Sequence, residues 1–203
     1  MHNIYTTQGI VLNSFDTGES NKFFYLFTRE LGLINATAQG VRKISSKNRY
    51  GLQDFSISDI SLVRGKDIWR ITNVSPIENL FFIFSGQGIR ENKRFDFILS
   101  IFSLLRKLIH GEEKNEELFD IVSDTVNFLK ERDLSKKELE NLGLITNIKI
   151  LNNLGYFDKN VSKELFSDFL SSRELSNKLI LKMETVKKEA QKMIGEIFEE
   201  MHL

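Results

Sequence analysis

The sequence predicts an α+β protein in which a β-rich segment comes first and a helical segment follows. In the first part, short aromatic and β-branched runs lie between turn signals, a pattern typical of strands. From residue 88 onward, apolar residues recur every three or four positions, which is typical of helices. We therefore expect residues 1–79 to form a β domain and residues 80–203 a helical domain.

Five segments of the β domain are predicted strands, because each is rich in residues that favour strands and is bounded by turn residues. They are residues 10–12, 22–28, 33–38, 55–63 and 68–72. In the fourth segment, Ile60 and Leu62 would lie on one face and Asp59 on the other. Five short strands with little else favour the five-stranded Greek-key barrel called the OB-fold. Pro76 is expected to end the strand pairing and to turn the chain toward the helices.

The second part is expected to form an all-α bundle. Apolar stripes predict helices over residues 95–109, 118–129, 135–155 and about 175–201. Ser135 and Glu138 match a capping box at the start of the third helix. Gly155 suits a left-handed cap at its end.

Composition argues against several classes of function. The formal net charge is zero and there are no cysteines, so zinc bound by cysteine, iron–sulfur clusters and thiol catalysis are excluded. The histidines, at 2, 110 and 202, have no metal-ligand spacing, and no phosphate loop or nucleophile elbow is present. We therefore expect no enzyme, no metal and no cofactor. No run of 18 apolar residues suggests a membrane span, and a cytoplasmic protein is expected.

One stretch of the β domain carries a chemical signal. Residues 31–53 contain no Asp or Glu, whereas they contain four cations: Arg42, Lys43, Lys47 and Arg49. Cations interleaved with hydroxyls and Tyr50 suit the phosphates and bases of a nucleic acid. Lys22 and Arg29 would extend this patch. An ordinary solvated loop has the same composition, so the charge pattern leaves both interpretations open.

Two further features of the β domain could either bind a nucleic acid or have ordinary structural roles. Arg64 and Lys66, in the turn before the fifth strand, form a second cationic candidate that Asp67 partly offsets. Phe23, Phe24 and Phe27 would be stacking platforms if they were exposed. Their apolar neighbours favour a core role instead.

The order of several short motifs resembles the N-terminal domain of the bacterial recombination mediator RecO. These are residues 9–12 (GIVL), 18–22 (GESNK), 26–32 (LFTRELG), 38–43 (AQGVRK) and 51–55 (GLQDF). Residues 151–156 (LNNLGY) are similar to the end of that family's central helix. The resemblance implies an OB-fold followed by a helical bundle, without catalytic residues.

The resemblance also implies a set of partners. Members of the family bind single- and double-stranded DNA, anneal strands, recognise the C-terminal tail of single-strand-binding protein and, with RecR, help to load RecA. Arg42 and Lys43 stand where the family's basic motif follows its glycine, while Lys47 and Arg49 rest on charge alone. Many members carry a cysteine zinc cluster after the central helix, which this chain lacks, so it resembles a short, zinc-free member.

Two other functions stay open from the sequence. The long apolar stripes of the helical part would also suit a protein-interaction adaptor without DNA affinity. An OB-fold that binds RNA is the other alternative.

Overall fold

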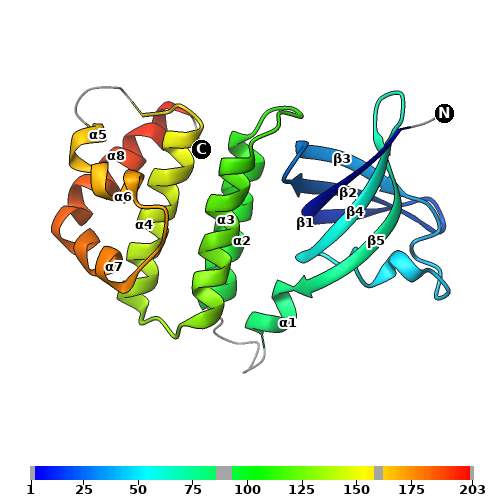
Figure 1. The fold of residues 1–203 in the computed structure, drawn as a ribbon, viewed down its shortest axis with the longest axis horizontal. Helices are drawn as coiled ribbons and strands as arrows, with labels where there is room; N and C mark the ends of the chain where they lie inside the picture. The colour runs from blue at the N-terminus through cyan, green and yellow to red at the C-terminus, as the bar shows by residue number, and fades with distance from the viewer. Residues whose placement is uncertain (1–2, 86–92, 158–161, 202–203) are drawn as a thin grey trace. The chain divides into compact units, whose positions relative to one another are not determined.

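The computed structural model describes residues 3–85, 93–157 and 162–201 of the chain (Figure 1). It divides into two compact units. The first comprises residues 1–95 and 109–119, and the second comprises residues 96–108 and 120–203.

The first unit is built on a closed barrel of five strands in the order β1-β2-β3-β5-β4. The strands are β1 (Ile4–Thr17), β2 (Asn21–Thr28), β3 (Gly32–Ala38), β4 (Ser56–Arg64) and β5 (Trp69–Asn79). Strands β3 and β5 pair in parallel, whereas every other pairing is antiparallel. The α+β class and the OB-fold barrel are therefore confirmed.

Strand β1 closes the barrel because it pairs with two neighbours in turn. Residues 4–10 pair with β4, and residues 9–17 pair with β2. A bulge at Leu12 bends the strand, since the pairing with β2 passes from Val11↔Leu26 to Asn13↔Tyr25. The sequence located only residues 10–12 of this strand, because the polar residues on either side of that apolar run pair mainly through their backbone.

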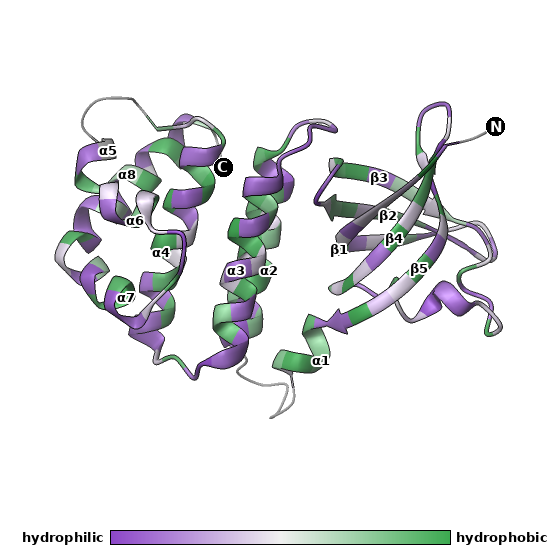
Figure 2. Cartoon of the chain, in the orientation of Figure 1, coloured by the Kyte–Doolittle hydropathy of each residue, from purple (hydrophilic) through white to green (hydrophobic). Residues whose placement is uncertain are grey.

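The barrel interior is filled by apolar side chains from all five strands. Ile60 and Leu62 are fully buried and Asp59 is exposed, as the alternation in the fourth strand predicted. Two members of the core cluster, Val41 and Leu52, come from the loop between β3 and β4. That loop contains the short 3-10 helix η1 (Lys47–Arg49), which is drawn as strongly hydrophilic in Figure 2.

The expected role of Pro76 was wrong. Strand β5 continues through Pro76, which is paired with Ser58, and ends only at Asn79. An irregularity in the pairing follows directly, where Glu78 faces Ile57. Strand β3 pairs with β5 only at Trp69 and Arg70, so a missing N–H is tolerated farther along the strand.

The barrel is followed by helices. Helix α1 (Leu80–Phe84) follows β5 in the first unit, and α2 (Lys93–Leu108) and α3 (Glu116–Glu131) contribute residues to both units. The second unit continues with α4 (Lys136–Asn153), α5 (Ser162–Leu165), α6 (Ser167–Ser171), α7 (Asn177–Met183), η2 (Glu184–Val186) and α8 (Lys187–Glu200). None of the helices in this described part is both long and apolar enough to cross a membrane.

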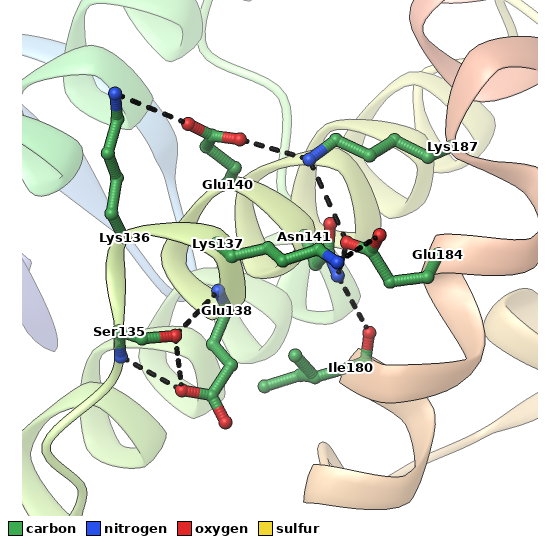
Figure 3. A network of polar contacts seen from close by, with 9 residues as sticks. All are labelled: Ser135, Lys136, Lys137, Glu138, Glu140, Asn141, Ile180, Glu184 and Lys187. Carbon is green, nitrogen blue, oxygen red and sulfur yellow. Dashed lines mark hydrogen bonds and ion pairs between the residues drawn. The ribbon is translucent and has the colours of Figure 1, made fainter.

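Helix α4 is the centre of the second unit, since α6, α7 and α8 all pack against it. Ser135 and Glu138 form the predicted capping box at its start, and Gly155 has the predicted left-handed conformation after its end, with φ of +83°. The buried amide of Asn141 donates to the carbonyl of Ile180 (3.1 Å) and to Glu184 Oε1 (2.7 Å) (Figure 3). This network joins α4 to α7 and η2.

The single last helix expected over residues 175–201 is interrupted in the structure. The 3-10 turn η2 separates α7 from α8, and Val186 leaves the helical region with φ of −125°. Thr185 and Val186 are adjacent β-branched residues, which lose side-chain freedom in a helix. Thr185 Oγ1 donates instead to the carbonyl of Lys182 (2.8 Å).

Candidate nucleic-acid interface

The loop between β3 and β4 is held at both ends by the barrel core. Gly40 begins it with a left-handed φ of +65°, and the next residue, Val41, enters the core. At the other end, Leu52 is buried, and a Cβ at Gly51 would lie 2.5 Å from Val74 Cγ1. Ser58 Oγ also donates to the carbonyl of Gly51 (2.8 Å). The ends of this cationic loop, residues 42–51, are therefore fixed in position.

Three of the predicted cations lie exposed on this loop. Lys43, Lys47 and Arg49 have exposed side chains, and none of them makes a side-chain hydrogen bond or an ion pair with the residues that the structure describes. The backbone between them is ordered by turns, since Ser46 N donates to the Lys43 carbonyl (3.0 Å). A preorganised row of cations loses less conformational entropy on binding than a flexible one.

Arg42 has a different environment from its neighbours. Its guanidinium donates to the carbonyls of Gly18 (3.1 Å) and Glu19 (3.2 Å) and forms an ion pair with Asp16 (3.1 Å). These partners surround the turn between β1 and β2, and Arg42 N donates to the Ser20 carbonyl there as well (3.0 Å). Arg42 thus joins the cationic loop to that turn.

Lys22 and Arg49 meet at a cleft of about 420 Å³ beside the loop. Asp16, Val41, Arg42, Leu52 and Gln53 complete its lining. The Lys22 ammonium donates to Ser14 Oγ (2.8 Å), which in turn donates to Asp54. The structure therefore brings five of the six predicted cations to one end of the barrel, although two of them already have partners there.

Arg29 is the predicted cation that lies apart. It follows the far end of β2 from Lys22, a span of roughly 23 Å for seven residues of strand. Its side chain lies 3.9 Å from Glu116 and over the ring of Phe119. A hydrogen bond and the charge of Lys114 hold the pKa of the Glu116 carboxyl below its usual value, with a smaller contribution from Arg29. Arg29 is thus part of an acidic and aromatic cluster.

Arg64 and Lys66, the second cationic candidate, have different environments in the structure. Arg64 forms an ion pair with Glu112 and lies over the ring of Trp69, 4.9 Å from its centroid. Trp69 Nε1 donates to the same carboxylate (3.1 Å). Lys66 is exposed and lines a hollow of about 620 Å³ together with Thr37, Arg64, Gly65, Asp67, Ile68 and Arg70.

The structure adds aromatic residues that the charge pattern did not identify. Phe24 and Phe27 are buried, as expected, but Phe23 is only half-buried and points outward with Tyr25. Phe15, on β1, is 49% exposed and meets Tyr25 edge-on. The inward position of Phe24 is the signal that would have placed Phe23 and Tyr25 outside, because side chains alternate along a strand.

The topology and these surfaces define a barrel of the OB-fold class that carries an anchored cationic loop. Residues 1–80 of the chain match the family described as recombination protein O, N terminal. The chain is thus a relative of the RecO proteins, and its barrel belongs to their N-terminal domain family, as the motif order indicated.

Three relatives, each named DNA repair protein RecO, illustrate the extent of the similarity. The protein from Alkaliphilus metalliredigens is 28% identical over 146 residues, which are 71% of this chain and 56% of that protein. The one from Pelotomaculum thermopropionicum is 30% identical over 154 residues, 75% of this chain and 56% of that protein. The one from Thermodesulfovibrio yellowstonii is 32% identical over 155 residues, 75% of this chain and 58% of that protein. The chain therefore spans little more than half the length of the curated relatives it matches.

Proposed function

We propose that this protein binds DNA in recombinational repair, and that the cationic loop supplies the contact to the phosphate backbone. The observation that carries the proposal is the exposure of Lys43, Lys47 and Arg49 on a loop whose ends lie in the barrel core. The relationship to proteins named DNA repair protein RecO supports the choice of DNA as the ligand.

The finer activities follow from the family resemblance. We propose that the chain binds single- and double-stranded DNA, anneals complementary strands and, with RecR, helps to load RecA on DNA covered by single-strand-binding protein, whose C-terminal tail it would recognise. It would act as a binding protein without a catalytic site, in the cytoplasm where bacterial DNA lies. Binding and annealing need only charge neutralisation and access to the bases, which a cationic barrel surface can supply.

Salt dependence tests the site directly. Three phosphate contacts predict a slope of log affinity against log salt of about −2 for single strands, using roughly 0.7 per contact. Wild-type affinity for a labelled oligonucleotide should then fall by about 16-fold between 50 and 200 mM salt. The variant Lys43→Ala/Lys47→Ala/Arg49→Ala should bind weakly and with a nearly flat dependence on salt.

A variant with the same loss of charge elsewhere is the control. Lys178, Lys188 and Lys192 are exposed on α7 and α8, and their replacement by Ala should leave both the affinity and the slope unchanged. Equal effects of the two triple variants would show a non-specific charge effect and refute the loop assignment. Competition with RNA of the same sequence distinguishes DNA binding from the RNA alternative.

A further inference from the structure

The outer surface of the barrel carries a row of side chains that crosses four strands. Phe15 on β1 faces Phe23 on β2, Phe23 faces Thr37 on β3, and Thr37 faces Arg70 on β5. Phe24, Ala36, Ala38, Trp69 and Ile71 alternate with members of this row and lie in the core. The four side chains of the row therefore share the outward face.

The aromatic side chains of this row are partly exposed. Tyr25 lies next to it on β2 and contacts both phenylalanines, with ring centroids 5.9 Å from Phe15 and 5.3 Å from Phe23. Both contacts are edge-to-face. Phe15 is half-exposed, and the adjacent strand offers Thr37 and Asn35, which are polar without charge. We call Phe15, Phe23 and Tyr25 the aromatic face.

Cations border one side of the outward row that includes the aromatic face. Arg70 is exposed at the β5 end of the row and lines the hollow that also contains Lys66. Asp16 follows Phe15 and Lys22 precedes Phe23 in the chain. Because side chains alternate along a strand, those of Asp16 and Lys22 lie on the opposite face, where they line the cleft with Arg49. Asp67 is the acidic residue that lines the hollow. An aromatic surface beside cations complements unpaired bases on a phosphate backbone.

We infer that the aromatic face is a second nucleic-acid surface, which holds a single strand by stacking its bases on Phe15, Phe23 and Tyr25. Arg70 and Lys66 would take the phosphates at its β5 side. This inference rests on the proposed function and assigns DNA binding to two surfaces of the barrel. The cationic loop takes phosphates of either form of DNA, whereas stacking requires bases that are free of a duplex.

The test separates loss of stacking from loss of apolar packing. In Phe15→Leu/Phe23→Leu, leucine keeps most of the apolar bulk but has no aromatic ring. Stacking contributes about 1–3 kcal/mol per base, so each lost ring should weaken binding of a thymidine oligonucleotide about fivefold or more. Affinity for a duplex of the same length should change by less than about twofold, and the salt slope should stay as in the wild type.

A matched control uses an aromatic residue off this face. Phe82, on α1, is 64% exposed, and Phe82→Leu should leave binding of both ligands unchanged. Melting curves of the variants show that the barrel is folded. A second measurement needs no variant: an oligonucleotide with 5-iodouracil, cross-linked to the wild-type chain by light, should give adducts on Phe15, Phe23 or Tyr25.

The outcomes of these experiments are distinct. Equal loss of single-strand and duplex binding in Phe15→Leu/Phe23→Leu, or adducts confined to Tyr50 in the cationic loop, would overturn the inference. Wild-type single-strand affinity in this variant, with loss of binding in the loop variant, would overturn the inference and leave the proposed function standing. Absence of any DNA binding by the wild-type chain would overturn both.

Discussion

Replacement of Arg42 by Lys should weaken the barrel without weakening DNA binding. The guanidinium spans three oxygen atoms around the β1–β2 turn, at 3.1 to 3.2 Å, and its side chain is 39% exposed. Lysine keeps the positive charge but carries a single ammonium, so it cannot reproduce a planar fork with two nitrogens on different partners.

The magnitude follows from the three contacts. An exposed ion pair contributes about 0.2–1 kcal/mol, and each hydrogen bond to a partly solvated carbonyl contributes about 0.5–1 kcal/mol. We expect Arg42→Ala to lower the free energy of unfolding by about 2 kcal/mol and Arg42→Lys by about 1 kcal/mol. With an m-value of about 2 kcal/mol/M in urea, these losses shift the midpoint by about 1 M and about 0.5 M.

Trp69 makes this measurement specific to the barrel. It is the single tryptophan of the chain and is 5% exposed in the barrel core, so its fluorescence follows unfolding of the first unit. Binding of an oligonucleotide by Arg42→Lys should stay within about twofold of the wild type, because the charge is retained. A wild-type urea midpoint combined with a tenfold loss of affinity would refute the structural role and identify Arg42 as a direct contact.

Three further predictions concern folding and the placement of the loop. Hydrogen bonds from Lys137 and Asn141 hold the pKa of the Glu184 carboxyl below its ordinary value (Figure 3). The carboxylate therefore stabilises the fold above about pH 4.5, and this contribution is lost as the pH falls through the lowered pKa. In Glu184→Gln, the free energy of unfolding, measured by circular dichroism, should decrease less steeply toward acid pH than in the wild type. Gly32 has φ of +69°, and a Cβ there would lie 2.1 Å from the carbonyl oxygen of Glu113. Gly32→Ala should therefore lower the free energy of unfolding in urea by about 2–4 kcal/mol. A wild-type urea midpoint would contradict this close approach. Gly51→Ala would place a Cβ 2.5 Å from Val74 Cγ1 and so displace the cationic loop. Oligonucleotide affinity should then fall although every cation is kept. Unchanged binding would show that the loop tolerates the shift.

Local signals in the sequence predicted most of the elements. Ser135 and Glu138 act on backbone groups within one helical turn, so their capping box is visible from spacing alone. The same holds for the barrel strands, whose alternation reports which face is buried. The extra length of β1 was missed because its outer residues are held by pairing with distant strands rather than by their own propensity.

The charge pattern located the cationic loop, but it did not show which of its cations have intramolecular partners. Lys43 and Arg42 are neighbours of the same charge, yet of the two side chains only that of Arg42 bonds to the β1–β2 turn in the described structure. The sequence does not show this contact, because the turn comes from another part of the chain. Arg29 lies apart from the other cations because nearly the whole length of β2 separates it from Lys22. Composition reports how many charges a segment has, whereas the barrel decides which of them have intramolecular partners.

The burial of both Val41 and Leu52 has a consequence for how this barrel can change. Because these two residues fasten the loop to the core, the residues at its tip, 43–50, contribute little to the barrel interior. Substitutions at the tip should cost little stability. If the loop binds DNA as proposed, its affinity could therefore be changed by mutation while the scaffold is retained. The same two anchor points make the tip a suitable position for grafting a foreign peptide.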